Sequence, residues 1–187
     1  MPVFVKHQER LSNQQCIVVA NHASYVDILA MFEIIPGDFA FLGKAELKQW
    51  PLFGQFFSSG LHVAVERKNV VKRHASYQQA LDKLNMGVSI AIFPEGGIKP
   101  EAPKLAPFHA GAFRMAIEKQ LPIVPVTIMN SARRFESNDV FFGPASPGAI
   151  RAIVHEPVST SGLELSDLIH LRNQVFDTIN HTLNEGK

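Results

Sequence analysis

Two residues that can transfer a proton, His22 and Asp27, stand five positions apart just after an apolar run. The run, residues 16–20, is short and rich in β-branched residues, which predicts a buried strand. Asp27 precedes apolar residues 28–32, which predict the start of a helix. Five residues on a straight helix rotate by about 500°, so the pair can meet only if the chain bends between them. In that geometry the carboxylate orients one imidazole nitrogen and leaves the other as a base that can activate a hydroxyl.

The same pair also fits a plainer interpretation. A histidine close to an aspartate is commonly a surface hydrogen bond or part of a helix cap. Catalytic groups are defined by proximity in space rather than in sequence. The spacing of His22 and Asp27 alone therefore leaves both interpretations open.

The elements that must position this pair alternate between strands and helices. That order predicts a single α/β domain over 1–187 with a largely parallel mixed sheet flanked by helices. Residues 140–184 supply its last strands and helix. Further strands are predicted at 39–43, 61–65, 88–93, 121–128, 141–142 and 150–154, and helices from 28, over 70–84, over 111–120 and over 163–183; residues 44–48 read as another helical start.

Polar turns follow several of these strands. His22 follows the strand at 16–20, Arg67 and Lys68 follow the strand at 61–65, and Glu95-Gly96-Gly97 follow the strand at 88–93. Because the carboxyl ends of parallel strands share one edge of a sheet, we expect these turns to meet in one crevice. Lys44, after the strand at 39–43, can reach the same edge. Arg67 there can hold a phosphate with two bonds, although a solvated turn fits Arg67 and Lys68 equally well.

Composition and missing motifs exclude several classes of protein. The net charge of +1 gives no argument for a nucleic-acid partner. The single cysteine, Cys16, lies in an apolar run and reads as strand packing. Gly43-Lys44 is not a P-loop because the glycine and hydroxyl positions are missing, and no G-x-S-x-G elbow makes Ser24 a nucleophile. No clustered cysteine and histidine set predicts a metal site, and no run is long enough to span a bilayer.

Residues 21–27, NHASYVD, resemble the NHxxxxD box of the lysophosphatidic acid acyltransferases, the PlsC-type glycerolipid acyltransferase family. Other stretches resemble the family's remaining blocks in the same order. They are KAEL with PLFG at 44–54, GLHVAVER at 60–67, FPEG at 93–96 and IVPV at 123–126. The likeness covers residues 21–126. The stretch at 44–54 stands beside four numbered blocks, at 21–27, 60–67, 93–96 and 123–126, and four blocks in order are far more specific than any one alone.

Two departures from the family pattern reduce the positive charge that is expected around a bound phosphate. Gly97 and Ile98 stand where the third block usually continues with threonine and arginine, with Lys99 next. The later F-K-x-G pattern reads Phe108-His109-Ala110-Gly111, so a basic residue has become His109. Both differences concern the acceptor head group more than the acyl chemistry.

The resemblance implies transfer of a fatty acyl group from acyl-CoA or acyl-carrier protein to a lysophospholipid hydroxyl, foremost that of 1-acyl-sn-glycerol-3-phosphate, in phospholipid biosynthesis. It makes His22 the general base and Asp27 its orienter. Lys44, Arg67 and Lys99 would hold the acceptor phosphate. Gly96 and Gly97 would approach the oxyanion with their N–H groups. Glu95 would brace the site or bind the acceptor's hydroxyls. No metal and no bound cofactor is expected.

Two alternatives stay open beside this function. The acceptor can be another lyso-lipid or an amino-acid-derived molecule, or the protein can bind lipid without turnover. A lipid substrate also implies a membrane surface as partner. We expect peripheral binding at the cytoplasmic face, or an upstream anchor. Aromatic residues between Trp50 and Phe57 either dock there, line an acyl groove or form core.

Overall fold

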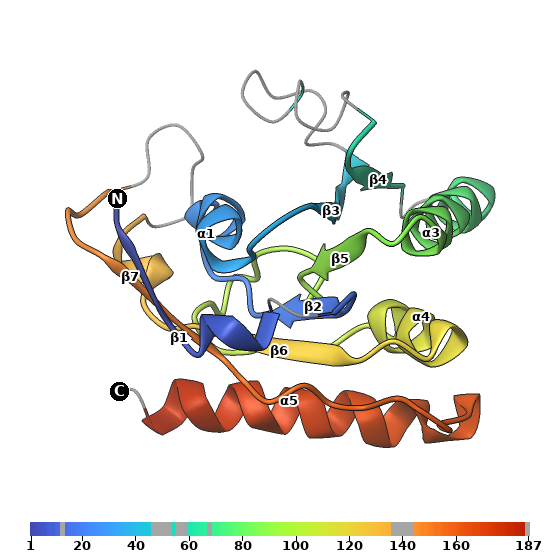
Figure 1. Ribbon diagram of the computed structural model, residues 1–187. Helices are drawn as coiled ribbons and strands as arrows, with labels where there is room; N and C mark the ends of the chain where they lie inside the picture. The colour runs from blue at the N-terminus through green and yellow to red at the C-terminus, as the bar shows by residue number, and fades with distance from the viewer. Residues whose placement is uncertain (12–13, 46–53, 55–59, 67–68, 136–143, 186–187) are drawn as a thin grey trace.

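The computed structural model describes residues 1–11, 14–45, 54, 60–66, 69–135 and 144–185 (Figure 1). Seven strands form one sheet in the order β1-β7-β6-β2-β5-β3-β4. The strands are β1 (Val3–Lys6), β2 (Ile17–Ala20), β3 (Phe39–Lys44), β4 (Val63–Val65), β5 (Ser89–Ile92), β6 (Ile123–Ile128) and β7 (Ile150–Val154). The helices are α1 (Val26–Ile34), α3 (Val70–Asn85), α4 (Gly111–Lys119) and α5 (Leu168–Glu185), with 3-10 turns η1 (Gln8–Leu11), η3 (Ser131–Arg133) and η4 (Leu165–Asp167).

The predicted α/β fold with a largely parallel sheet is confirmed. Strands β2 to β6 run parallel to one another, whereas β7 pairs antiparallel with β6 and parallel with β1. The sequence analysis did not anticipate β1. Its four residues alternate between half-buried and exposed, as expected of a short edge strand, and the apolar run Val3-Phe4-Val5 is shorter than the run at 16–20 that indicated β2.

The central strand β2 places the candidate base. All four of its residues are buried because β5 and β6 flank it and helices cover both faces of the sheet. Helix α1 packs into the core on one face, whereas α3, α4 and α5 pack into the core on the other (Figure 1). Cys16, just before β2, is buried, and burial raises the pKa of its thiol to about 11. Its predicted packing role is therefore confirmed.

Strand β6 accommodates a proline within a central position of the sheet. The Pro125 carbonyl accepts a hydrogen bond from the His155 N–H on the β7 side. The nitrogen of Pro125 faces the same side, and the paired register of β6 with β7 ends at Val126. The missing N–H thus falls at a gap in the pairing, as the sequence predicts.

Some predicted boundaries differ. Lys44 is the last residue of β3 rather than the start of a helix, and residues 46–48 and 141–142 lie outside the described residues. The last helix, α5, begins at Leu168, later than predicted. Glu164 and Asp167 form a capping box around η4, so the first turn of the predicted helix is a 3-10 turn.

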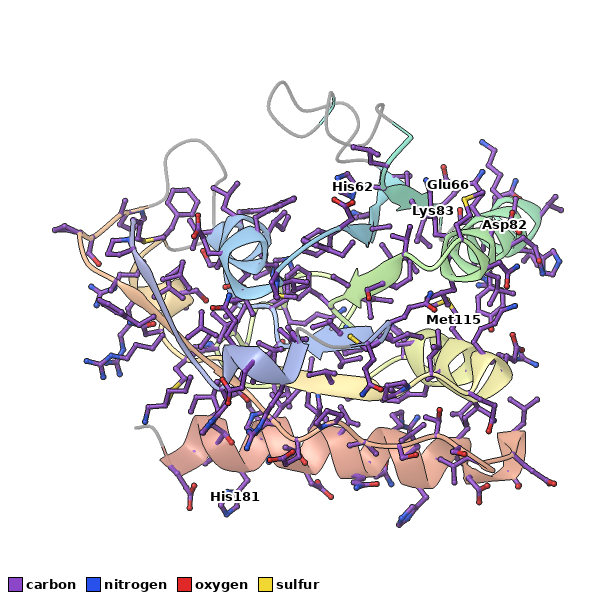
Figure 2. The ribbon with its side chains drawn as sticks, viewed as in Figure 1. His62, Glu66, Asp82, Lys83, Met115 and His181 are labelled. Atoms are coloured by element: carbon purple, nitrogen blue, oxygen red, sulfur yellow. The ribbon has the colours of Figure 1, made fainter. Side chains whose placement is uncertain are left out.

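His62 ties β3 to the segment before β4. Its Nδ1 accepts a hydrogen bond of 3.1 Å from the Phe41 N–H, so this nitrogen must stay unprotonated. Burial and then the positive charge of Lys83 lower the pKa of His62 from 6.5 to about 4. Figure 2 shows both residues near β4. Folding therefore favours the neutral ring.

Replacing His62 with asparagine should flatten the pH dependence of folding stability. In the wild type the unfolded chain takes up a proton on His62 below about pH 6.5, whereas the folded chain does so only near the lowered pKa of about 4. Stability is thus lost as the pH falls through this window. The His62→Asn amide oxygen can still accept from Phe41 but does not titrate there. Urea unfolding at pH 7 and pH 5 should show a larger loss for the wild type; equal losses would contradict this account.

Candidate active site

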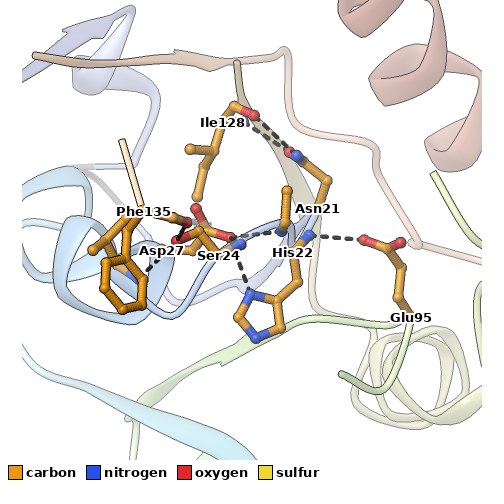
Figure 3. A network of polar contacts seen from close by, with 9 residues as sticks. Asn21, His22, Ser24, Asp27, Glu95, Ile128 and Phe135 are labelled. Atoms are coloured by element: carbon orange, nitrogen blue, oxygen red, sulfur yellow. Dashed lines mark hydrogen bonds and ion pairs between the residues drawn. The ribbon is translucent and has the colours of Figure 1, made fainter. Parts of the chain in front are cut away.

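The turn between β2 and α1 brings His22 and Asp27 together (Figure 3). Asp27 is the second residue of α1, and its Oδ2 lies 3.0 Å from His22 Nδ1. The chain bends between them, as the catalytic interpretation of the spacing requires. A carboxylate can only accept here, so His22 Nδ1 carries the proton and donates it. The other ring nitrogen, Nε2, then has a free lone pair.

One oxygen of Asp27 organises the whole turn. Besides the His22 ring, Oδ2 accepts hydrogen bonds of 2.8 Å from the backbone N–H groups of Ala23 and Ser24. The Asp27 side chain is fully buried, and the N-terminus of α1 favours a negative charge. These bonds hold the carboxylate at one position. Oδ1 of Asp27 is buried with no hydrogen-bond partner among the described residues.

The imidazole plane of His22 is held by an aromatic neighbour. The ring of Phe93, just after β5, stacks on it with 4.1 Å between centroids and 10° between planes. Only 7% of the His22 surface is exposed. Its Nε2 makes no hydrogen bond to any described residue, and His22 lines a cavity. The sequence analysis missed the role of Phe93, although the residue stands in the FPEG stretch.

Glu95 braces the site from behind. Its Oε1 accepts a 2.7 Å bond from the His22 backbone N–H, and its Oε2 accepts a 2.8 Å bond from the Ala106 N–H. Only 2% of Glu95 is exposed, and burial raises the pKa of its carboxyl. Both oxygens are engaged and Glu95 does not line the cavity. Of the two predicted roles, the structure favours bracing over binding acceptor hydroxyls.

Asn21 and Ser24 fasten the same turn to β6 and to the segment beyond it. The Asn21 amide both donates to the Ile128 carbonyl at 2.9 Å and accepts from the Ile128 N–H at 2.8 Å. Ser24 Oγ donates to the Phe135 carbonyl at 2.7 Å. The sequence analysis gave neither residue a structural role. Polar side chains directly after an apolar strand were the sequence signal that could have indicated these roles.

A cavity of about 390 Å³ opens beside the His22 ring. Several predicted site residues line it, from three separate segments: His22, Lys44, Gly96, Gly97 and Lys99. Tyr25 and Ile28 of α1 and Phe41 of β3 complete much of its wall. The turns after β2 and β5 therefore share one crevice, as predicted, and Lys44 at the end of β3 reaches it; Arg67 and Lys68, in the predicted turn after β4, are not among the described residues. Arg67 lies outside the described residues, so its phosphate contact stays a prediction.

The glycine turn requires one correction. The Gly96 N–H donates to the Phe93 carbonyl at 3.0 Å and closes the turn, so Gly96 cannot also serve an oxyanion. The Gly97 N–H makes no hydrogen bond to a described residue, and Gly97 lines the cavity. Its φ of 137° lies in a region that side chains disfavour. Gly97 is the remaining candidate donor.

A second cavity of about 720 Å³ adjoins the first. Leu42, Phe93 and Gly96 belong to the walls of both. Apolar side chains from β4, β5 and α4, including Val65, Ile92 and Met115, line its interior. Within the described residues, no group of three or more histidine, cysteine or acidic side chains could hold a metal ion.

The base is held by a buried carboxylate and lies beside two lysines at the edge of a parallel sheet. This arrangement forms a site that can activate a hydroxyl. Family comparison agrees, because the Acyltransferase family model matches residues 2–129. The chain belongs to that family.

Particular relatives are similar over most of the chain. The chain is 30% identical to a 1-acyl-sn-glycerol-3-phosphate acyltransferase of Cocos nucifera over 90% of its own length and 54% of the relative's. It is 30% identical to 1-acyl-sn-glycerol-3-phosphate acyltransferase alpha of Mus musculus over 87% and 56%. The crystal structure of the 1-acyl-sn-glycerophosphate acyltransferase PlsC from Thermotoga maritima superimposes with a TM-score of 0.81 at 25% identity, covering 98% of this chain and 71% of that one. The chain thus spans about half the length of these curated relatives.

Replacing Asn21 with leucine should destabilise the fold. The change keeps the side-chain size but leaves the Ile128 N–H and carbonyl without the partners they now have. Two buried unpaired groups cost about 2–4 kcal/mol of unfolding free energy. Urea unfolding measures this, with Asn173→Leu on the exposed face of α5 as a matched control. Equal effects of the two substitutions would show that the Asn21 bonds contribute little.

Proposed function

We propose that this protein transfers a fatty acyl group from a thioester to the hydroxyl of a lysophospholipid, 1-acyl-sn-glycerol-3-phosphate in the first place. The observation that carries the proposal is the His22–Asp27 pair, whose 3.0 Å bond leaves Nε2 unbonded among the described residues beside a lysine-lined cavity. The names of the relatives from Cocos nucifera and Mus musculus support the choice of acceptor.

The acceptor's phosphate would lie near the lysines. Lys44 ends β3 and Lys99 follows the glycine turn, so both line the cavity from different sides. No acidic side chain among the described residues lines this cavity. A phosphate monoester carries nearly two negative charges at neutral pH, which two or three cations can balance. Arg67 is the third cation in this proposal.

Each proton in the reaction then has a defined place. His22 Nε2 takes the proton of the acceptor hydroxyl as its oxygen attacks the thioester carbonyl. Asp27 stabilises the resulting imidazolium through Nδ1–H. The tetrahedral oxyanion receives a hydrogen bond from the Gly97 N–H. When the intermediate collapses, the carbon–sulfur bond breaks and the thiolate takes the proton back from Nε2.

The acyl donor enters as a substrate and no bound cofactor is required. Coenzyme A and acyl-carrier protein both present a thioester at the end of the same pantetheine arm. The larger cavity shares walls with the reaction cavity and is lined inside by apolar residues such as Met115, so it suits a hydrocarbon chain. Figure 2 labels Met115 on α4.

The experiment that tests this function measures acyl transfer from labelled acyl-CoA or acyl-carrier protein to a panel of lyso-lipids and amino-acid-derived acceptors. His22→Ala should lower the rate by about 10²–10⁴-fold, because the base is lost. Asp27→Asn should also be severe, since an amide can face His22 with its NH₂ group and hold the wrong tautomer.

His170→Ala is the matched control, because His170 is exposed on α5 and lines neither cavity. It should leave the rate unchanged. Near-wild-type transfer by His22→Ala would refute the base assignment. A wild-type protein that binds the lipids without turnover would identify a lipid-binding member of the family instead.

The membrane contact is part of the same proposal. No helix among the described residues is long and apolar enough to cross a bilayer. Helix α1 lines the cavity with Tyr25 and Ile28 and also exposes Leu29, at 60%, and Phe32, at 43%. These apolar surfaces next to the reaction cavity support peripheral binding to a membrane surface; the cytoplasmic face is the part of this proposal that rests on the expected function alone. The aromatics of the stretch from Trp50 to Phe57 belong to the same expectation, but all four of them lie outside the described residues.

Vesicle sedimentation tests this contact. The protein should pellet with anionic vesicles, with little effect of salt because the net charge is only +1. Leu29→Gln should weaken pelleting, whereas Ile169→Gln, which alters an equally exposed side chain on α5, should not. The emission of Trp50, the only tryptophan, should shift to the blue on adding vesicles. Unchanged pelleting of Leu29→Gln would show that α1 does not touch the membrane.

A further inference from the structure

A third cavity, of about 350 Å³, carries an unbalanced positive charge. Four cations line it: Lys104, Arg133, Arg134 and Arg151. They come from the loop after the glycine turn, from η3 and its end, and from β7, while the C-terminal end of α5 closes the floor. Figure 1 shows that end of α5 on the same side of the molecule as β7. No aspartate or glutamate of the described chain lines the cavity.

Three of the four cations have no partner within the described part of the chain. The side chains of Lys104, Arg133 and Arg151 are exposed and make no hydrogen bond or ion pair with a described residue. Arg134 differs, because it donates to the carbonyls of Pro147 and Ala149 and so holds the wall together. Like charges converging on one concave surface repel one another and raise the local concentration of anions. The cavity is therefore suited to a ligand with several negative charges.

This basic cavity is built onto the turn that carries His22. Two of the segments around it are hydrogen-bonded to that turn or to its brace: the loop with Lys104 and the segment from Met129 to Arg134. Glu95 bonds the Ala106 N–H beside Lys104, Asn21 bonds Ile128 before Met129, and Ser24 bonds the Phe135 carbonyl beside Arg134. A ligand in the basic cavity would thus contact segments that are hydrogen-bonded directly to the turn of His22 or to its brace.

One loop lines both places. Gly96 to Lys99 face the reaction cavity, and Pro103 to Leu105 face the basic cavity. The loop is folded back by a turn in which the Ala102 N–H bonds the Lys99 carbonyl. The ends of such a turn are less than about 7 Å apart and one further residue adds about 3.8 Å, so the Cα atoms of Lys99 and Pro103 lie within roughly 11 Å.

We propose that the basic cavity binds the phosphate end of the acyl donor, the 3′-phospho-ADP of coenzyme A. This inference rests on the proposed thioester-dependent function. Coenzyme A carries three phosphate groups at the far end of a long pantetheine arm, so its phosphates must bind apart from the carbonyl at His22. The guanidinium group of an arginine can donate hydrogen bonds to two phosphate oxygens at once. The side chains of Arg133 and Arg151 make no hydrogen bond or ion pair with a described residue, so both can do this.

A membrane headgroup fits this cavity less well. Its cations converge from three segments into a hollow of about 350 Å³, whereas a bilayer meets a protein on an open face. The exposed apolar side chains of α1, Leu29 and Phe32, do not line it. A soluble ligand with several neighbouring phosphate groups can enter the hollow and contact cations from all three segments.

The test measures binding of desulfo-coenzyme A, which cannot react, to the full chain by titration calorimetry. The double variant Arg133→Gln with Arg151→Gln should bind at least about tenfold more weakly, a change of about 1.4 kcal/mol. The control, Lys119→Gln with Arg172→Gln, loses the same net charge from α4 and α5 outside this cavity and should bind as the wild type does.

A kinetic measurement separates this inference from the proposed function. The cavity variant should raise KM for acyl-CoA but leave KM unchanged for the acceptor and for an acyl thioester of N-acetylcysteamine, which lacks the nucleotide. Unchanged affinity for desulfo-coenzyme A would overturn the inference and leave the acyl transfer intact. Binding that depends on the cavity while no acyl group is ever transferred would support the site and refute the proposed function.

Three further outcomes would also overturn the inference. Equal weakening in the cavity variant and the control would reveal a mere effect of net charge. Loss of anionic-vesicle pelleting without loss of desulfo-coenzyme A binding would assign the cavity to the membrane. Loss confined to acyl-carrier protein as donor would assign it to that protein's acidic surface.

Discussion

The arrangement depends on one buried oxygen, Oδ2 of Asp27, that accepts three hydrogen bonds. Two of them come from backbone N–H groups and fix where the carboxylate sits, and the third fixes which nitrogen of His22 carries the proton. Because the carboxylate is fully buried, the interactions operate away from water, where they are strongest. The turn, the helix start and the base are therefore a single structural unit.

Everything around that unit limits its movement. Phe93 holds the ring from one face, Glu95 holds the His22 backbone, and Asn21 ties the end of β2 to β6. These groups come from segments separated by up to about a hundred residues along the chain. In the proposed reaction, a base positioned in this way loses little entropy on reaching its reactive geometry, which is a contribution that a rigid scaffold makes to catalysis.

The fold was largely predictable because its strands are short apolar runs and its helices have apolar periodicity. Strands β2, β5 and β6 were visible in the sequence for this reason, whereas the edge strand β1 was not. The meeting of His22, Lys44 and Gly97 followed from the rule that parallel strands end at one edge, whereas Lys99 was expected there only from the family resemblance. The bonds of Asn21 and Glu95 could not be predicted, since their partners are backbone groups that no sequence pattern identifies. The engagement of the Gly96 N–H within its own turn was invisible for the same reason.

That dependence on backbone partners has an evolutionary consequence. Asn21, Ser24 and Glu95 reach the main chain of Ile128, Phe135 and Ala106, and every amino acid offers the carbonyls there, while all but proline offer the N–H groups. These hydrogen bonds place no demand on the side chains at the three partner positions, although Ile128 is held by its own burial in the core. The geometry of the His22 turn can thus persist while the sequences of the loops that surround it diversify.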